Sequence, residues 1–342
     1  MDKKTTLKDI SKRLGLSIPT VSRALGGYED ISLKTRELVS RVAKEMNYFP
    51  NVYARGLVAK KTPAKNILIM GVPTVLQSIA LNSYYAEIMR AFHDESIDTD
   101  YRFVLSVGEA DNNVFKDYRA LIQNHAASAA IILDYLEDDN RVKELTKANV
   151  PLVVLGEYLP QTDLQCSVWT DNIAGSFEAT KYLIERGRKR IVLVSGLKGQ
   201  MVSKSRLYGY RKAIEKAGIP FDPDLIVGAK EMDEHGGYYA MVEFFERGQE
   251  FDAVFCTSDL RSIGVIKALR EKGFVVPDDV SVVGYDDLPI ASYFDPQLTT
   301  VRQPTYQVGV YAIESLKKLL SGEKVASCQK VFKPELIIRQ SA

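Results

Sequence analysis

The chain has 342 residues, of which 46% are apolar and 26% are charged. This composition is typical of a globular protein and excludes disordered and collagen-like chains, and the length predicts two or three domains. Three cysteines, Cys166, Cys256 and Cys328, are far apart, which excludes a regular disulfide framework and favours a reducing compartment. The N-terminus lacks the apolar core of a signal peptide and no window reaches about eighteen uninterrupted apolar residues, so we expect a cytoplasmic protein without membrane association.

Positive charge is concentrated at the start of the chain. Residues 1–65 contain 14 Lys and Arg against 6 Asp and Glu, whereas the remaining 277 residues contain 31 against 38. A cationic N-terminal region on an anionic body is suited to holding a polyanion at one end of the molecule. Charge alone is equally consistent with a solvated basic surface, and the residue pattern within this region favours the first interpretation.

The first fifty residues predict three short helices. Thr6 can cap the first helix with Asp9 as its capping-box partner, and Gly15 ends it. Ser17 begins the second helix and Ser32 caps the third. Apolar residues at spacings of three and four give each helix one buried face: Leu7, Ile10 and Leu14, then Val21 and Leu25, then Val39, Val42, Ala43 and Met46. Two helices joined by a Gly-containing turn and braced by a third are typical of a helix-turn-helix DNA-binding domain, here residues 1–49.

The second helix leaves side chains exposed that suit DNA. Ser17 and Thr20 can bond phosphate oxygens, and Arg23 can pair with O6 and N7 of guanine. Ile18 and Pro19 offer apolar edges to thymine methyl groups. The alternative for Arg23 is a solvated surface arginine. The DNA contacts that we expect from this domain are Thr6, Ser17, Ile18, Pro19, Thr20, Ser22 and Arg23.

Two long motifs stand at the start of the chain, TLKDISKRLGLSIPTVSRAL and ISLKTRELVSRVAKEMNYFPNVYARGL, and three shorter ones stand near its end, GYDD, DPQLTTVRQP and ELIIRQS. In these motifs the chain resembles the lactose-repressor/galactose-repressor (LacI/GalR) family of bacterial transcription regulators. The resemblance implies an α/β protein with a three-helix helix-turn-helix domain, a hinge helix, and a two-lobed core of doubly wound parallel sheets, like a periplasmic binding protein. It also implies a repressor whose affinity for operator DNA is set by a small effector.

By this resemblance, residues 50–65 form a hinge helix and linker. Asn51 can cap a helix of two turns, which would be marginal alone in water because helix nucleation is unfavourable. In the resembled family such a helix orders on DNA and inserts a leucine into the minor groove. Leu57 matches that leucine, and Arg55 would lie against phosphate. We therefore expect Asn51, Arg55 and Leu57 to contact DNA, and the alternative is a simple tether.

From residue 66 onward, short apolar runs alternate with helical stretches. They predict strands at 67–72, 103–107, 130–133, 152–155, 191–194, 253–256 and 280–284, and helices at 173–186, 204–217, 262–272 and 307–320. Such runs separated by helices indicate parallel sheets covered on both faces, and a core over 66–342 is longer than one such sheet usually holds. By the resemblance, lobe one would take about 66–165 and 297–324. Lobe two would take about 166–296 and 325–342, with a final strand near 331–339.

Ligands of open parallel sheets bind beyond the carboxyl ends of the strands. Charged and aromatic side chains there suit a polyhydroxylated ligand, because charged groups pair with neighbouring hydroxyls and rings stack on sugar faces. The candidates are Tyr84, Tyr85, Asp134, Trp169, Arg206, Ser258 and Asp286. The carboxylates of Asp171 and Asp259 fit helix caps equally well, and Trp169 also fits a core position. The resemblance implies that Arg206 and Asp286 are the main effector contacts.

The chain departs from the resembled family inside this region. Many relatives carry Asp after the strand PLVVL, where this chain has Gly156 followed by Glu157. The difference puts the usual monosaccharide pattern in doubt and leaves room for a larger or differently substituted ligand. Gln200 and Val202 stand where purine-responsive relatives have Arg and Thr, which argues against a nucleobase. We expect a carbohydrate effector, with a corepressor, a purine or a sugar acid as alternatives.

The sequence does not indicate an enzyme. It has no G-x-x-x-x-G-K-[ST], no G-x-G-x-x-G after a strand and no H-E-x-x-H, and His93, His125 and His235 are scattered. We therefore expect neither a catalytic site nor a metal or other cofactor. A periplasmic solute-binding protein would share the core but would need an export signal and would have no use for a basic N-terminal region.

The predicted DNA-binding domain bears on the oligomeric state. One helix-turn-helix reads about half a site, so we expect a homodimer on pseudo-palindromic double-stranded DNA. The chain ends at Ala342 without a heptad-patterned tail, and we therefore expect no coiled-coil tetramer. In the resembled family, effector binding shifts the angle between the lobes and controls whether paired hinge helices order.

Overall fold

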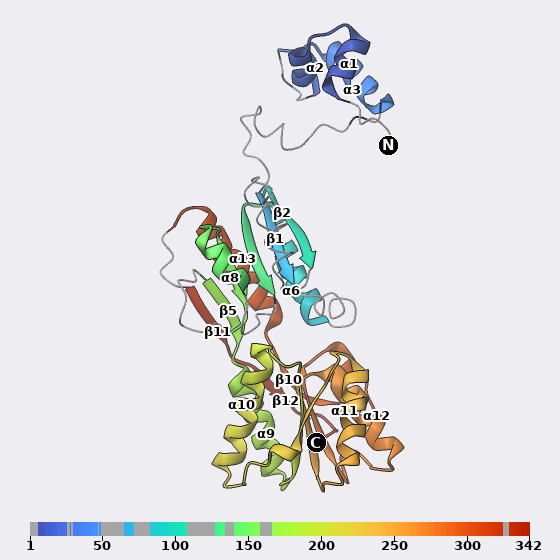
Figure 1. The fold of residues 1–342 in the computed structure, drawn as a ribbon, viewed down its shortest axis with the longest axis vertical. Coiled ribbons are helices and arrows are strands. Elements are labelled where there is room, and N and C mark those ends of the chain that lie inside the picture. Colours follow the sequence, from blue (N-terminus) through green and yellow to red (C-terminus); the bar gives the residue numbers. More distant parts are fainter. Residues whose placement is uncertain are drawn as a thin grey trace. The chain divides into compact units, whose positions relative to one another are not determined.

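A computed structural model describes residues 6–25, 28, 30–46, 48, 65–71, 83–107, 127–133, 140–157, 166–323 and 328–342. They fall into two compact units, Met1–Ala64 and Lys65–Ala342 (Figure 1). The predicted hinge residues Asn51, Arg55 and Leu57 lie outside the described residues, and so does Asp134. Within the described ranges, no helix combines the length and the apolar character needed to cross a bilayer.

The N-terminal unit has the three helices that the sequence predicts. They are α1 (Leu7–Leu14), α2 (Ile18–Leu25) and α3 (Leu33–Glu45). The Thr6 hydroxyl accepts from the Asp9 amide while the Asp9 carboxylate accepts from the Thr6 amide, which completes the expected capping box. Gly15 ends α1 in the left-handed conformation, with a φ of 65°. The helices share a core of Ile10, Val21, Ala24, Val39, Val42 and Ala43. The three-helix prediction is confirmed, with Ala24 more deeply buried than Leu25.

The first sheet of the C-terminal unit has the order β11-β5-β4-β3-β1-β2, and all its pairings are parallel. Its elements are β1 (Lys65–Gly71), α6 (Ser83–Asp94), β2 (Tyr101–Val107), β3 (Ala129–Leu133), α8 (Asn140–Lys147), β4 (Leu152–Leu155), β5 (Cys166–Thr170), α13 (Thr305–Leu320) and β11 (Cys328–Phe332). Ile67 and Ile69 pack with α6 and α13. Leu68 and Met70 pack with α8 on the other face. Both faces are therefore buried, as the continuous apolar runs predict.

The second sheet has the order β12-β10-β9-β8-β6-β7, with only the edge strand β12 antiparallel. Its elements are α9 (Asn172–Glu185), β6 (Ile191–Ser195), α10 (Met201–Lys216), the 3-10 turn η1 (Pro223–Leu225), β7 (Ile226–Gly228), α11 (Glu234–Glu246), β8 (Ala253–Cys256), α12 (Asp259–Glu271), β9 (Ser281–Asp286), the 3-10 turn η2 (Pro289–Ser292), β10 (Thr299–Arg302) and β12 (Glu335–Ile337). Figure 1 shows α9 and α10 on one side of this sheet and α11 and α12 on the other. Ile191 and Leu193 pack toward the first pair, and Val192 and Val194 toward the second.

The chain passes between the two sheets three times, each time through a very short segment. Asp171 alone joins β5 to α9. Gln303 and Pro304 join β10 to α13, and Lys333 and Pro334 join β11 to β12. The first and third segments lie side by side, because the Asp171 amide donates to the Phe332 carbonyl at 2.8 Å.

These crossings correct the predicted lobe boundaries. Cys166–Thr170 forms β5 of the first sheet although it was assigned to lobe two, and Thr299–Arg302 forms β10 of the second sheet although it was assigned to lobe one. The single strand expected near 331–339 is two strands, β11 in the first sheet and β12 in the second. An apolar run identifies a strand but not its neighbour, and the hydrogen-bonding partner decides which sheet the strand joins.

The seven predicted strands and four predicted helices are present, within a few residues of the expected ends. The strands that were not predicted, β5, β7 and β10, are short. Their sequences, CSVWT, IVG and TTVR, mix small or polar residues with apolar ones. Such segments lack the continuous apolar run by which a buried parallel strand is recognised.

Candidate functional sites

Five of the ten residues predicted to contact DNA lie on α2, and Ser17 comes directly before it. Ile18 is 43% exposed at the start of the helix, and Pro19 beside it is also exposed. The hydroxyls of Ser17 and Thr20 hydrogen bond to each other at 2.7 Å, and the Thr20 amide donates to Ser17 Oγ at 3.2 Å. Ser22 lies half-buried on the same helix. The start of α2 thus presents an apolar edge next to two exposed hydroxyls.

Arg23 is held at the surface by two neighbours. Its Nη2 lies 2.7 Å from Oδ2 of Asp30, and its guanidinium lies 5.5 Å from the centroid of the Tyr28 ring. About half of each charged side chain is exposed. Ion pairs of this kind contribute about 0–1 kcal/mol, so another anion can replace Asp30 at small cost.

Thr6 has a local structural role. Its hydroxyl donates to Oδ2 of Asp9 at 2.6 Å within the capping box of α1. A DNA contact by Thr6 therefore has to share this hydroxyl and stays a prediction. The contacts expected of Asn51, Arg55 and Leu57 also stay predictions.

A cleft lies between the two sheets of the C-terminal unit, beyond the carboxyl ends of β4, β8 and β9. The space between its walls, open mouth included, is about 940 Å³. Six of the seven predicted effector contacts line it: Tyr84, Tyr85, Trp169, Arg206, Ser258 and Asp286. The strand-end rule therefore brings together residues that are as far apart as 84 and 286 in the sequence.

Arg206, in the second turn of α10, is fixed by several contacts. Its Nε donates to Oδ1 of Asn172 at 2.9 Å and its Nη1 to the Thr257 carbonyl at 2.6 Å. Its guanidinium lies over the Tyr285 ring, 3.7 Å from the centroid. Its Nη2 is 3.6 Å from Oδ1 of Asp286. The side chain is 7% exposed, so its position in the cleft is set before any ligand arrives.

Asp286 ends β9 in an unusual backbone conformation. Its φ is 115°, and the φ of the next residue, Asp287, is 53°. Residues other than glycine rarely adopt these backbone conformations, which cost about 1–3 kcal/mol each and occur often at functional sites. Hydrogen bonds hold the turn: Gln303 Nε2 donates to Asp286 at 2.7 Å, and Arg302 and Arg339 donate to Asp287 at 2.7 and 2.6 Å. The carboxylate of Asp286 is thereby aimed into the cleft next to Arg206.

The structure shows the surroundings of Asp171, Asp259 and Trp169, for which the sequence left a structural role and a ligand contact both open. Asp171 caps α9, since its Oδ1 accepts from the Ala174 amide at 2.9 Å. Asp259 is fully buried and accepts from Oγ1 of Thr300 at 2.5 Å and from the Leu288 amide at 2.7 Å. Burial, and after it the nearby charge of Asp286, raises the pKa of Asp259 well above its usual range. Trp169 is half-buried and lines the cleft.

Glu157 supplies an acidic group on the side of the cleft where the sequence left one in doubt. It follows β4 in the first lobe and lines the cleft. Its carboxylate accepts a hydrogen bond from the Ser205 hydroxyl of α10, in the second lobe. The two lobes are therefore linked by a side-chain contact.

The cleft also contains residues that the sequence analysis did not identify. Arg261, Thr257, Asn172, Gln303, Thr170 and Met232 are among them. Arg261 is three positions after Ser258, one helical turn into α12, and is 3% exposed. The strand-end pattern predicts Ser258 as a contact, and residues three positions apart lie on the same face of a helix. This spacing could have identified Arg261 as a second candidate.

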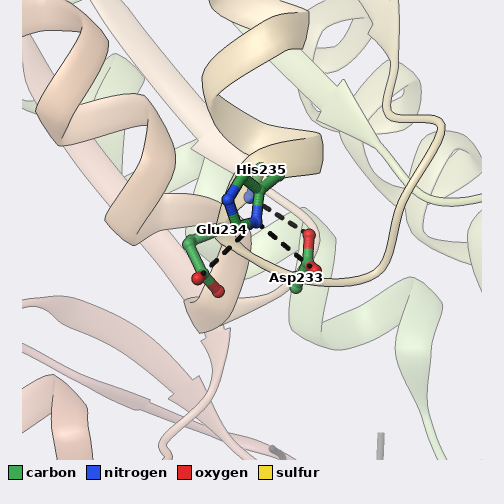
Figure 2. Close-up of side chains that lie close together, drawn as sticks. All are labelled: Asp233, Glu234 and His235. Carbon is green, nitrogen blue, oxygen red and sulfur yellow. Dashed lines mark hydrogen bonds and ion pairs between the residues drawn. The ribbon is translucent and has the colours of Figure 1, made fainter. Parts of the chain in front are cut away.

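Three consecutive side chains lie close together at the start of α11 (Figure 2), and none of them lines the cleft. Nδ1 of His235 is 3.6 Å from Asp233 Oδ2 and 3.6 Å from Glu234 Oε1. The potential ligand atoms of the three lie within 4.8 Å of one another, a spacing that a metal ion could use. Oδ1 of Asp233 accepts from the amides of His235 and Gly236, so helix capping accounts for this arrangement.

Comparisons with known proteins cover both units. Residues 6–51 match the family described as bacterial regulatory proteins, lacI family, and residues 180–342 match a periplasmic binding protein-like domain. The chain is 33% identical over 338 residues to the HTH-type transcriptional regulator RegA of Clostridium saccharobutylicum, covering 98% of this chain and 99% of RegA. It is 33% identical over 340 residues to the regulator CelR of Thermobifida fusca, covering 99% and 98%.

Solved structures of similar proteins extend over the same length. A transcriptional regulator CelR-cellobiose complex matches with a TM-score of 0.75 and 30% identity, covering 99% of this chain and 100% of that one. The lac repressor dimer bound to operator and the anti-inducer ONPF matches with a TM-score of 0.75 and 25% identity, covering 99% of each chain.

Proposed function

The chain belongs to the lacI family of bacterial regulatory proteins, and we propose from this premise that it represses carbohydrate-utilisation genes under the control of a sugar-like effector. Its relatives are DNA-binding transcription regulators and not enzymes, and this chain is likewise a helix-turn-helix transcription regulator. Such a role belongs in the cytoplasm, where the protein meets double-stranded DNA.

The DNA-binding part of the proposal rests on the exposed face of α2. Ile18 and Pro19 face base edges in the major groove, the hydroxyls of Ser17 and Thr20 meet phosphate, and Arg23 exchanges Asp30 for guanine. One such domain reads half a site, so a homodimer on a pseudo-palindromic operator is part of the proposal. At the centre of that operator, Leu57 enters the minor groove, with Asn51 and Arg55 at its sides.

The observation that carries the effector part is the buried pair of Arg206 and Asp286 in a cleft lined from both lobes. Both side chains are held by other residues, and each can direct hydrogen bonds to neighbouring hydroxyls of a sugar. Tyr84, Tyr85 and Trp169 add aromatic surface for its apolar faces. The likeness to a regulator solved with cellobiose supports a carbohydrate ligand.

The coupling between the two sites follows from the position of the cleft between the lobes. A ligand that binds one lobe arrangement better than another shifts the population toward the first. Couplings of this kind are typically about 1–3 kcal/mol, or about 5- to 150-fold in operator affinity. The contact between Glu157 and Ser205 belongs to one such arrangement, because it joins the two lobes directly.

The proposal is tested with the full-length protein. Its operator is selected from randomised pseudo-palindromic duplexes, and binding is measured by fluorescence anisotropy with and without each member of a sugar panel. We expect specific operator binding that one sugar class weakens by about 5- to 150-fold. A ligand that strengthens binding would instead show corepression. Failure to select any duplex, or a cleft ligand without effect on DNA affinity, contradicts the proposal.

A further inference from the structure

Arg261 is a buried arginine with few partners. It lies in the first turn of α12, lines the cleft and is 3% exposed. Its Nε donates to the Glu231 carbonyl at 3.4 Å and its Nη1 to Oγ1 of Thr257 at 3.5 Å, both at the long limit of a hydrogen bond. Its Nη2 has no hydrogen-bond partner among the described residues, nor does the side chain form an ion pair with any of them.

A cation in this position is costly to the protein without a ligand. Burial, and after it the nearby charge of Arg206, lowers the pKa of Arg261 to about 10. The side chain therefore still carries its charge at neutral pH. A buried charge is normally paired, because its lost hydration has to be replaced. Within the described part of the chain, nothing replaces it at Nη2.

Other polar groups of the cleft are unpaired beside it. The hydroxyls of Ser258 and Thr170 are buried, line the cleft and have no hydrogen-bond partner among the described residues. Ser258 occupies the N-cap position of α12, yet its side chain makes no capping hydrogen bond. The partial positive charge at the start of α12 adds to that of Arg261.

The carboxylates of the cleft are engaged elsewhere. Asp286 is near Arg206 and accepts from Gln303, and Glu157 accepts from Ser205. Asp259 does not line the cleft, and its two oxygens accept from Thr300 and from the Leu288 amide. The charges of Asp286 and Asp233 also act on Arg261, but no carboxylate among the described residues forms an ion pair with it or accepts from its Nη2.

We propose that the effector carries an oxyanion, a carboxylate or a phosphate attached to a sugar, and that Arg261 and Ser258 bind it at the start of α12. This inference rests on the proposed effector function of the cleft. The sugar ring then lies toward Arg206 and Asp286, and the oxyanion accepts from Nη2 of Arg261 and from the Ser258 hydroxyl. A neutral sugar could bond these donors through hydroxyls but would leave the arginine charge unpaired.

The first experiment compares matched ligands on the full-length protein by thermal shift and calorimetry. Each sugar of the panel is supplied in a neutral form, as its uronate or aldonate, and as its phosphate ester, for example glucose, glucuronate, gluconate and glucose 6-phosphate. We expect an acidic form to bind at least about tenfold tighter than its neutral counterpart, since a hydrogen bond to a charged group is typically worth that much. Preference for the carboxylate or for the phosphate ester identifies the source of the oxyanion.

The second experiment replaces the arginine. Arg261→Gln and Arg261→Met should each lower affinity for the acidic ligand about 10- to 150-fold and change affinity for its neutral counterpart by less than about threefold. Without ligand, Arg261→Met should unfold at the same or a higher temperature than the parent, because an unpaired buried cation is removed. Arg211→Gln is the matched control. It removes the same charge from an exposed arginine of α10 that pairs with Glu215, and should change neither affinity.

The outcomes separate the two levels of the proposal. A neutral sugar that binds the cleft tighter than its acidic forms overturns the role of Arg261 and leaves a sugar-controlled repressor intact. Acidic binding that survives Arg261→Gln and Arg261→Met unchanged also overturns it. A protein that no member of the panel stabilises contradicts the proposed effector function itself, and this inference with it.

Discussion

The arginine of α2 and the arginines of the cleft differ in their surroundings. Arg23 is half-exposed and pairs with one exposed carboxylate, whereas Arg206 is 7% exposed and is held by an amide, a carbonyl, a carboxylate and a ring. An exposed pair exchanges its partner at little cost. A buried pair does not exchange in this way, because removing one partner leaves the other charge buried and lowers the stability of the fold. Arg23 is therefore free to exchange its partner, whereas Arg206 already has a fixed position in the cleft.

Asp286→Ala should have the largest effect, because it removes the carboxylate next to a buried arginine. We expect the free energy of unfolding to fall by about 3–5 kcal/mol and the effector response to be lost, while operator binding at low temperature is retained. Urea unfolding and anisotropy measure the two effects. Asp286→Asn retains an acceptor for Gln303 and should be milder. If the alanine variant still responds to effector, Asp286 is not an effector contact.

Arg23→Ala tests whether the exposed arginine of α2 contacts a base of the operator. We expect a loss of about 1–3 kcal/mol in operator affinity, confined to one base position and without effect on unfolding. Binding to operators substituted at each position measures this. The control is Arg13→Ala, which removes another exposed arginine of the same unit, paired with Glu45. Uniform weakening over all sequences by Arg23→Ala would assign the side chain to phosphate.

The contact between Glu157 and Ser205 should have an intermediate effect. Glu157→Gln and Ser205→Ala each weaken a link between the lobes, so we expect effector affinity to fall by about 1 kcal/mol in either variant. The double variant should cost no more than one single variant, because both remove the same contact. Strictly additive losses in calorimetry would show that the two side chains act independently.

Asp30→Ala should have the smallest effect, since it only releases Arg23 from an exposed ion pair. We expect operator binding to tighten by about 0–1 kcal/mol. Glu45→Ala removes a similar charge from the same unit but frees Arg13 instead. Equal tightening by both variants would mean that overall charge, and not Arg23, is responsible.

The sequence predicts the broad fold and much of the cleft because both follow from local patterns. Continuous apolar runs predict parallel strands, and the residues after them include Arg206, Ser258 and Asp286. Sheet membership was not accessible in the same way: β5 pairs with β4 and β10 with β9, the strands that precede them in the chain, but no local pattern shows that the chain crosses to the other lobe after these strands and not before them. Assigning these strands requires the hydrogen-bonding register, which no local pattern contains.

The hydrogen-bond partners of individual side chains are the second feature that the sequence does not predict. Asp171 and Asp259 both stand where a strand gives way to a helix, yet Asp171 caps its helix, whereas Asp259 is the first residue of α12 and accepts from Thr300 of β10. Arg261 is an ordinary helix residue in the sequence. Its significance comes from the lack of a partner at Nη2 among the described residues, and that can be known only after the neighbouring elements are packed.

The three short segments that join the lobes restrict how the C-terminal unit can change shape. None is longer than two residues, and two of them contain a proline, whose ring fixes one backbone torsion. Linkers this short cannot extend, so the lobes are limited to twisting or tilting at the three segments, Asp171, Gln303–Pro304 and Lys333–Pro334. Gln303, in the second of these segments, also donates to Asp286. A ligand that displaces Asp286 by a fraction of an ångström therefore acts next to one of these joining segments, where a small rotation gives a large displacement at the far ends of the lobes.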